Sequence, residues 1–495
     1  MRYVTGMAIG VFVLTCAIAA YAAAPDSLWM RAYGDSLNQE CRCITQTSDG
    51  GYVLTGYTGI SIPGIPIQTD VYVVRLDSDG DTLWTNHYGG LGNDVGYAIR
   101  QTSDGGFIVA GYYTYVDDPI NRDVYLVRLD SLGTVQWEKR YGYAGSDEAA
   151  DVQVHVGDGG FLVAGYTQTP GPFDADVYLL RTDSNGDTLM TRQYDFTIND
   201  RALSICETVN AYVVCGYVQP GSQYDVLLLK TDSHLDSIWT KTYGGPNNEV
   251  SYSLKLTPDL GFIVAGRREL PDLGVNNAWA LRTDASGDTL WTVTMLDSVY
   301  NSFLSVDVTS DSGYVFAGMH RSVPLADRDC YVVKLAESGA VEWKTDYGTS
   351  TEDVALSIEQ VEGGDYILAG HTGLSGSGNT DALVVRTGGL SGVGARDPDI
   401  GDHGWVSALR VHPNPSAGSA AVTFNLAVED FISVAAYDVS GRQVANLFTG
   451  ELSAGRQALE WDGRDSGGLA VPPGVYFLRV TGGGGGSAGK LVLLR

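Results

Sequence analysis

The chain has 495 residues, of which 44% are hydrophobic, enough to build a large folded core. Its formal net charge of −28 argues against nucleic-acid binding, which needs clustered Lys and Arg to neutralise phosphates. Its 63 glycines are typical of a chain with many tight turns, and the acidic composition suits a soluble, secreted protein.

The N-terminus has the pattern of a secretory signal peptide, predicted for residues 1–22. Arg2 supplies the positive charge, an apolar core runs from Met7 to Ala20, and a small-x-small cleavage pattern follows. The core is too short to span a membrane, so we expect no membrane span in the mature chain. Cys16 leaves a lipid anchor as the alternative. These features predict a secreted or cell-surface protein.

From residue 23 onward, a unit of four short apolar runs repeats along the chain. In the clearest copy the runs are Gly96–Thr102, Phe107–Tyr112, Asp123–Leu129 and Val135–Tyr141, each rich in β-branched or aromatic residues and bounded by turn residues. Asp104-Gly105 marks a hairpin, because Asp-Gly supplies the positive φ of a tight turn. Each unit is therefore predicted to be a four-stranded antiparallel sheet.

Three positions recur in every unit, at a spacing of roughly 50 residues. The fourth run carries Trp29, Trp84, Trp137, Met190, Trp239, Trp291 and Trp343. The second run carries Gly56, Gly111, Gly165, Gly216, Gly266, Gly318 and Gly370, and the third carries Arg75, Arg128, Arg181, Lys230, Arg282, Lys334 and Arg386. Seven four-stranded units at this period predict an all-β fold, a seven-bladed β-propeller over residues 23–388.

The first and last units are incomplete and together make one blade. The repeats begin with a fourth run, Leu28–Tyr33, and the seventh unit ends after its third run, Asp381–Thr387. We therefore predict that Leu28–Tyr33 completes the blade that also holds Ala355–Gln360 and Tyr366–Gly370. A ring closed in this way has no free sheet edge that would invite aggregation.

The seven basic residues lie inside nearly continuous apolar runs, as expected where neighbouring blades cover both faces of a sheet. One interpretation is an anion site around the central channel. The other is a set of blade-to-blade ion pairs with Asp70, Asp123, Asp176, Asp225, Asp329 and Asp381. Repetition in every blade favours the structural interpretation, because a binding site usually breaks the symmetry of a repeat.

The cysteines beyond the signal peptide are odd in number, so at least one thiol is expected to be free. Cys206 and Cys215 lie on the first two strands of the fourth unit and are either disulfide-bonded or two small buried residues. Cys41 and Cys43 alternate along one strand. Two cysteines on one face, with no further ligand nearby, do not make a zinc site.

Acidic turns join the third and fourth strands at 77–81, 183–187 and 284–288. Clustered carboxylates suit Ca²⁺, but the order of an EF-hand loop is not met, and Asp-Gly or Asn-Gly turns form hairpins without metal. The seven histidines fall in no metal-binding or triad spacing. We therefore expect no cofactor, with calcium as the alternative.

The segments between second and third strands vary most from unit to unit. They are Thr58–Thr69, Tyr113–Arg122, Thr167–Ala175, Val218–Tyr224, Arg268–Asn276 and Arg321–Asp327. All should emerge on one rim of the ring, and variable loops on a repeated scaffold often carry recognition. The alternative is that they are surface loops that have drifted.

After a linker rich in Gly and Asp at 389–407, alternating runs predict a small Ig-like β-sandwich over 408–495. Its motifs are Pro413-Asn-Pro415, Tyr437-Asp-Val-Ser-Gly-Arg442, Trp461-Asp-Gly-Arg-Asp465, Gly474-Val-Tyr-Phe-Leu-Arg479 and Lys490-Leu-Val-Leu-Leu-Arg495. In this order they resemble the C-terminal sorting domains of type IX secretion cargo and the immunoglobulin-like half of flagellar hook-capping proteins. The resemblance implies that outer-membrane secretion machinery is a partner and that the protein is delivered to the surface. The repeats are similar to those of uncharacterised secreted bacterial propeller proteins, which implies no activity.

Together these features favour a secreted or cell-surface binding or scaffold protein over an enzyme. The propeller would recognise a glycan or protein through its variable rim loops, and the C-terminal domain would direct export and surface attachment. One alternative is a glycan-active hydrolase or lyase with its site at the channel mouth, which would need a carboxylate pair that breaks the repeat. No catalytic, cofactor-binding or metal-binding residue stands out. A third interpretation is a spacer in a cell-surface layer.

Overall fold

The computed structural model describes residues 24–61, 67–168, 174–270, 275–296, 300–321, 327–349, 351–373, 379–388, 406–412, 419–426, 430–438, 442–453, 455–482 and 485–493. The chain divides into two compact units, Met1–Ser391 and Gly392–Arg495. In the described ranges both units are built from β-strands, and no helix there could cross a membrane. The predicted signal peptide and most of the predicted linker lie outside these ranges.

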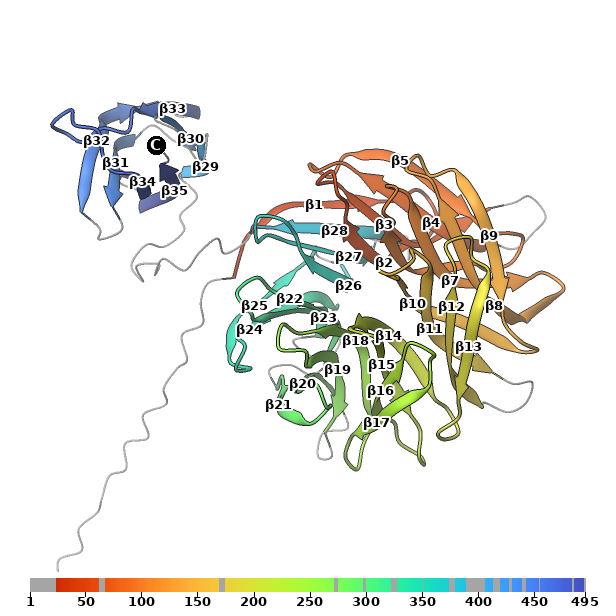
Figure 1. Ribbon diagram of the computed structural model, residues 1–495. Helices are drawn as coiled ribbons and strands as arrows, with labels where there is room; N and C mark the ends of the chain where they lie inside the picture. The colour runs from red at the N-terminus through yellow and green to blue at the C-terminus, as the bar shows by residue number, and fades with distance from the viewer. Residues whose placement is uncertain are drawn as a thin grey trace, which may run out of the picture. The chain divides into compact units, whose positions relative to one another are not determined.

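The first unit holds seven four-stranded antiparallel sheets arranged as a ring of blades (Figure 1). Blades 1 to 3 comprise β2 (Gln39–Gln46), β3 (Tyr52–Ile60), β4 (Gln68–Leu76) and β5 (Thr82–Tyr88); β6 (Val95–Gln101), β7 (Phe107–Tyr115), β8 (Asp118–Leu129) and β9 (Val135–Tyr141); and β10 (Ser146–Val154), β11 (Phe161–Gln168), β12 (Ala175–Thr182) and β13 (Thr188–Tyr194). Blades 4 to 6 comprise β14 (Arg201–Thr208), β15 (Ala211–Val218), β16 (Asp225–Asp232) and β17 (Ser237–Tyr243); β18 (Glu249–Leu256), β19 (Phe262–Glu269), β20 (Asn276–Thr283) and β21 (Thr289–Thr294); and β22 (Tyr300–Val308), β23 (Tyr314–Arg321), β24 (Asp329–Leu335) and β25 (Val341–Tyr347). The predicted number of blades and strands is confirmed.

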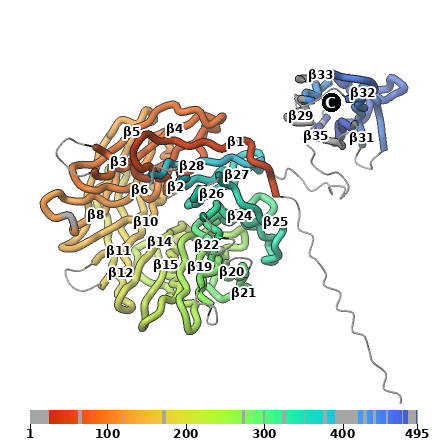
Figure 2. The backbone as a smooth tube through the Cα atoms, turned by 180° about the vertical axis from the view of Figure 1, so that it is seen from behind, coloured from red at the N-terminus to blue at the C-terminus, as the bar shows by residue number. Residues whose placement is uncertain are grey.

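Blade 7 joins the two ends of the repeat region. It contains β26 (Asp353–Gln360), β27 (Tyr366–Gly373), β28 (Thr380–Thr387) and, as its outer strand, β1 (Ser27–Tyr33). β1 runs antiparallel to β28, with Trp29 opposite Arg386, and the two strands lie side by side in Figures 1 and 2. As predicted, the N-terminal strand β1 therefore completes the last blade. Blade 7 also packs against blade 1, where the backbone N–H of Ile44 donates to Ser357 Oγ at 3.3 Å.

Each first strand lies toward the centre of the ring and contains one β-bulge at the same place (Figure 1). In blade 1 the register shifts between Cys41 and Cys43, and the other six blades shift at the equivalent position. A bulge inserts one residue into a strand, so the alternation of side chains is interrupted there. Cys41 consequently packs with the side chains between blades 1 and 7, whereas Cys43 packs with those between blades 1 and 2. The prediction that they share one face is wrong.

The remaining cysteines are separate thiols. Cys206 lies opposite Val213, and Cys215 lies opposite Ser204, so the two sulfur atoms are out of register for a cross-strand bond. Burial raises the pKa of Cys206 to about 12, which keeps it a thiol at neutral pH. The two residues are therefore not disulfide-bonded, and of the pair Cys215 is buried while Cys206 is partly buried.

The recurring Trp joins each blade to the next. Trp137, on the fourth strand of blade 2, packs over Gly186 in the acidic turn of blade 3, where a Cβ would lie 2.8 Å from the indole Cη2. Gly186 has a φ of 78°, a conformation that favours glycine. Tyr141 donates its hydroxyl to the Gly186 carbonyl at 2.6 Å, and Lys139 pairs with Asp187 at 2.5 Å. The acidic turns thus hold neighbouring blades together through backbone, aromatic and ionic contacts.

The joint between blades 3 and 4 uses a different pair of side chains. Met190 stands where the other blades have Trp, and the turn that it faces has Leu235 in place of Gly. Leu235 is fully buried and adopts a φ of 61°. A smaller, flexible thioether on one side is therefore matched by a larger aliphatic side chain on the other, which keeps the joint filled.

Six of the seven recurring basic residues form an ion pair within their own blade, and the seventh, Lys230, lies over the Phe262 ring. Arg128 is 7% exposed, and its guanidinium bonds both carboxylate oxygens of Asp104 at 2.6 Å, in the turn between the first two strands. It also donates to the carbonyls of Phe107 and Leu129. The equivalent pairs are Arg75–Asp49, Arg181–Asp158, Arg282–Asp259, Lys334–Asp311 and Arg386–Asp365.

These pairs correct the prediction of blade-to-blade bonding with Asp123 and its equivalents. Asp123 lies five residues before Arg128 on the same strand, β8, so about 16 Å of extended backbone separates them. The side chain of Arg128 instead reaches the hairpin turn beside its own end. The observed ion pairs attach a hairpin turn to a strand of the same blade and do not join two blades.

The second unit is a sandwich of two sheets. One sheet contains β29 (Val406–His412), β30 (Ala420–Leu426) and β33 (Gly455–Trp461), and the other contains β31 (Asp430–Asp438), β32 (Gln443–Leu452), β34 (Gly474–Gly482) and β35 (Gly485–Leu493). Phe424, Leu478 and Trp461 fill its core. The Trp461 ring meets Tyr476 at 5.2 Å, and its indole N–H donates to the Arg464 carbonyl at 2.8 Å, so two of the predicted motifs pack on each other. Pro413–Pro415 lies outside the described residues.

Candidate functional site

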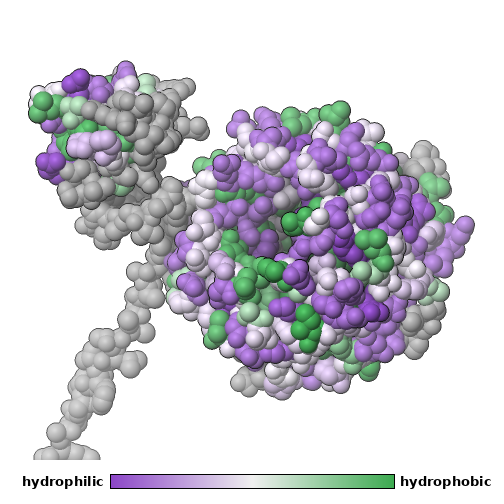
Figure 3. All heavy atoms as spheres, in the orientation of Figure 1, coloured by the Kyte–Doolittle hydropathy of each residue, from purple (hydrophilic) through white to green (hydrophobic). Residues whose placement is uncertain are grey.

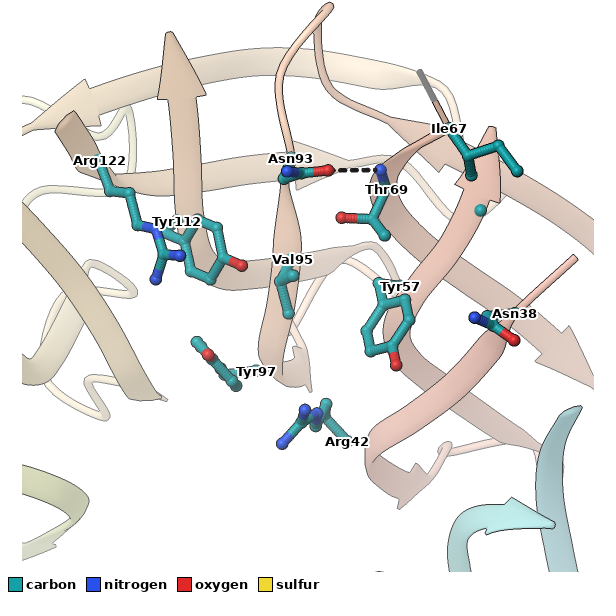
Figure 4. Close-up of a pocket in the computed structure, with 11 residues that line it drawn as sticks. Asn38, Arg42, Tyr57, Ile67, Thr69, Asn93, Val95, Tyr97, Tyr112 and Arg122 are labelled. Carbon is teal, nitrogen blue, oxygen red and sulfur yellow. Dashed lines mark hydrogen bonds between the residues drawn. The ribbon is translucent and has the colours of Figure 1, made fainter. Parts of the chain in front are cut away.

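Two adjoining pockets lie on the rim from which the loops between second and third strands emerge. One has a volume of about 360 Å³ and lies between blades 1 and 2, and the other has about 430 Å³ and continues across blades 2 to 4. Arg122 lines both. Figure 3 shows the ring as a space-filling surface with a hollow at its centre, and Figure 4 shows the first pocket. Both volumes fall in the range of small-ligand sites.

Arginines stacked on tyrosines form the wall between blades 1 and 2. The guanidinium carbon of Arg42 lies 5.5 Å from the Tyr97 ring centre, and that of Arg122 lies 4.3 Å from the Tyr112 ring centre. Tyr97 and Tyr112 are themselves 5.8 Å apart. Both arginines line the pocket in Figure 4. Such stacking fixes the plane of a guanidinium and so orients its N–H groups.

The same arrangement continues into blades 3 to 5. Arg201 on β14 lies 3.9 Å from the ring centre of Tyr166, and Arg267 on β19 lies 5.9 Å from that of Tyr252. Arg267 also reaches the hydroxyl of Tyr300 at 3.4 Å. We call the four arginine–tyrosine pairs, Arg42–Tyr97, Arg122–Tyr112, Arg201–Tyr166 and Arg267–Tyr252, the mouth arc.

Two glutamates on first strands balance part of this charge. Glu40 bonds Arg42 at 2.6 Å and accepts a hydrogen bond from the Tyr57 hydroxyl at 3.0 Å, while Glu148 pairs with Arg122. Burial, with the nearby charge of Glu40, raises the pKa of Tyr57 to about 12, so its hydroxyl remains a donor. In the described part of the chain, Arg201 has no carboxylate within ion-pair distance, which makes the arc locally cationic.

The mouth arc breaks the symmetry of the repeat. The residue after the second-strand glycine is Tyr57, Tyr112, Tyr166 and Tyr217 in blades 1 to 4, but Arg267, Met319 and His371 in blades 5 to 7. The bulged residue of the first strand is Arg42, Tyr97, Ala150, Leu203, Tyr252, Leu304 and Leu356 in chain order. A structural role would repeat in every blade, whereas an asymmetric distribution is expected of recognition.

The predicted rim loops border this site, although one differs from the prediction. Ile67, in the loop after β3, and Thr69, at the start of β4, line the first pocket on the predicted rim. Residues 113–122 were predicted as a loop, but β7 extends to Tyr115 and β8 begins at Asp118. The prediction failed because the aromatic run continues the strand pairing beyond Tyr112. The loop centres at 62–66, 169–173, 271–274 and 322–326 lie outside the described residues.

On this rim Glu40 and Asp200 accept hydrogen bonds from neighbouring donors, whereas Asp176 Oδ1 is buried without a partner among the described residues. His371 lies 3.6 Å from Glu40, and burial lowers the pKa of this histidine, so it is mainly neutral at pH 7. Among described residues, one group of three carboxylates, Asp176, Asp195 and Asp200, has ligand oxygens within 4.8 Å of one another and could hold a cation. Asp200 already accepts hydrogen bonds from the N–H groups of two residues in the preceding loop.

Sequence reasoning missed the mouth arc because it searched for positions that every blade shares. The second-strand sequence Gly-Tyr in four blades was a visible signal. The bulged residues could not be assigned to the channel from alternation alone, since the bulge reverses the predicted facing.

Comparison with known proteins finds one family match and one curated relative. Residues 413–486 match the FlgD Ig-like domain family. The regulatory protein FlaEY of Caulobacter vibrioides is 28% identical over 187 residues, which covers 33% of this chain and 19% of FlaEY. The chain thus matches less than a fifth of the length of this curated relative.

Two solved structures are also similar over much of the chain. The protein Sqt1 from Chaetomium thermophilum has a TM-score of 0.43 and 12% identity over 74% of this chain and 91% of its own. The Pan2 WD40 domain of Neurospora crassa has a TM-score of 0.43 and 10% identity over 75% of this chain and 98% of its own. At these scores nothing is added to the fold described above. The chain is a seven-bladed β-propeller followed by a FlgD-type Ig-like domain.

Proposed function

We propose that this chain is an extracellular or cell-surface binding protein that holds its ligand at the mouth arc. The observation that carries the proposal is the asymmetry of the arc. Arginine–tyrosine pairs come from blades 1 to 5, whereas blades 6 and 7 have Leu304 and Leu356 at the bulge and Met319 and His371 after the second-strand glycine. The two glutamates of the site are held by arginines at ion-pair distance, an arrangement that suits orientation of a ligand better than proton transfer.

The proposed location and export route have separate support. The predicted signal peptide supports secretion, and the match to FlgD Ig-like domains supports a surface-associated C-terminal unit. The ordered motifs that resemble type IX sorting domains support delivery across an outer membrane by that machinery. We expect a chain truncated at residue 395 to keep a folded propeller and to remain in the periplasm of a host with matching machinery. Surface delivery of the truncated chain equal to that of the full chain would contradict the sorting role.

Binding at the mouth can be tested before the ligand is known. The full-length protein and a Tyr97→Ala, Arg201→Gln double variant would be applied to an array of glycans and to extracellular protein extracts. We expect the native protein to retain a ligand that the double variant does not. A ligand bound equally by both would move recognition away from the arc, toward the rim loops or the C-terminal unit.

A further inference from the structure

Resting on the proposed function, we propose that the ligand of the mouth arc is an anionic polysaccharide, with a carboxylate or sulfate on successive sugar units. The first argument is periodicity. Arginine–tyrosine pairs come from adjacent blades, and Arg122 is shared by both pockets, so cationic groups recur along a continuous surface. A polymer with one anionic group per unit can engage several of them together, which increases avidity without requiring any single strong contact.

The second argument is the chemistry of each contact. A guanidinium presents a planar fork of N–H donors that matches the two oxygens of a carboxylate or sulfate. Arg201 lies 3.9 Å from the Tyr166 ring centre and has no carboxylate at ion-pair distance in the described ranges. Its donors toward the pocket are therefore available, apart from the Nε contact with Asn199 at 3.3 Å. Arg267 in the next blade has a tyrosine hydroxyl as its hydrogen-bond partner rather than an acid.

The third argument concerns sugar hydroxyls. Asn93 accepts a hydrogen bond from the Thr69 backbone N–H at 3.1 Å through its amide oxygen, and this fixes the amide orientation. Figure 4 shows the amide nitrogen on the opposite side, toward Tyr112. Neutral amide and hydroxyl groups beside aromatic rings suit sugars, whose rings have apolar faces and hydroxyl edges. An extended acidic peptide would instead call for regularly spaced hydrogen-bond partners for its backbone, as an open strand edge supplies.

The overall charge sharpens this inference. With a net charge of −28, the protein repels polyanions in general, so attraction must come from local contacts. Glu40 and Glu148 neutralise two of the four arginines, while Arg201 and Arg267 carry the excess positive charge. At Arg201, a substitution removes a cation of the pocket without leaving a buried carboxylate unpaired. Removing Arg122, by contrast, would leave Glu148 buried without its partner.

The test uses titration calorimetry with the full-length protein. The probes are oligogalacturonate for carboxylates, dextran sulfate for sulfates, neutral dextran, and poly-L-glutamate as an acidic peptide. The variants are Arg201→Gln and, as a matched control, Arg192→Gln, an exposed arginine of the outer strand β13 that pairs with Asp236. We expect at least one anionic polysaccharide to bind, with about a tenfold loss for Arg201→Gln, and no loss for Arg192→Gln.

The outcomes separate the ligand class from the site. Preference for oligogalacturonate or dextran sulfate would identify the anionic group. Equal binding by Arg201→Gln and native protein, or no binding to either anionic polysaccharide, would overturn the inference. Arg201-dependent binding of poly-L-glutamate alone would also overturn it while leaving the mouth arc as the binding site. If Arg201→Gln shows reduced folding by circular dichroism, Tyr166→Ala supplies the second variant, with the same expectation of weakened binding to the polysaccharide.

Discussion

The joint between blades 2 and 3 can be converted into the joint that blades 3 and 4 already use. We consider Gly186→Leu, Trp137→Met and the double variant, which reproduces the Met190–Leu235 pair. A leucine at a φ of 78° costs about 1–2 kcal/mol in backbone strain. Overpacking against an indole that would lie 2.8 Å from its Cβ adds about 1–3 kcal/mol.

Trp137→Met alone should destabilise by about 2–3 kcal/mol, because the indole also meets Phe161 at 5.8 Å. The smaller thioether makes room for the new leucine, so the double variant should be more stable than the sum of the single effects by at least about 1 kcal/mol. Guanidinium unfolding followed by circular dichroism measures all four free energies. Gly186→Leu combined with Trp84→Met, at a different joint, is the control and should be additive. Additivity in the Trp137 cycle as well would refute the packing argument.

Three further predictions concern closure, the ion pairs and pH. Deleting residues 23–34 removes β1, so cooperative unfolding of the whole propeller should be lost. An unchanged thermal transition would contradict the role of β1 in closing the ring. Asp104→Ala should destabilise the protein by about 3 kcal/mol, because it leaves the buried guanidinium of Arg128 without its partner. Arg128→Met should cost only about 1–2 kcal/mol, because Asp104 is 57% exposed and stays hydrated. Chemical unfolding measures both values, and a larger loss for Arg128→Met would contradict this reasoning. Burial raises the pKa of Asp94 to about 6, above its unfolded value, so the folded protein binds this proton more readily than the unfolded chain does. Lowering the pH from 7 to 5 should therefore increase the free energy of unfolding by about 1 kcal/mol. Asp94→Asn should lack this increment in unfolding titrations at the two pH values, and an identical pH dependence would exclude the assignment.

The repeat itself made most of the propeller predictable. Counting strands placed Leu28–Tyr33 in the last blade. The last unit lacked a fourth strand, and the N-terminal strand belonged to no other unit, so pairing the two was the simplest solution. The partner of Arg128 was not predictable in the same way, since Asp123 and Asp104 both recur with it and only the direction of the side chain decides between them. The sequence did not show that Cys41 and Cys43 point to opposite faces of their strand. A β-bulge lies between them, and apolar residues on both faces of the strand hide the break in alternation that would have revealed it.

The recurring bulge has a consequence for how this protein can change. Alternation commits most residues of a first strand to one core or the other, but the inserted residue belongs to neither. Ala150, Leu203 and Tyr252 occupy equivalent bulged positions, so a small, an aliphatic and an aromatic side chain are all accepted there. Each blade thus contributes one position whose identity is uncoupled from the packing of the ring. A library that varies only these seven positions could explore new specificities at little cost in foldability, much as antibodies vary their loops on a constant framework.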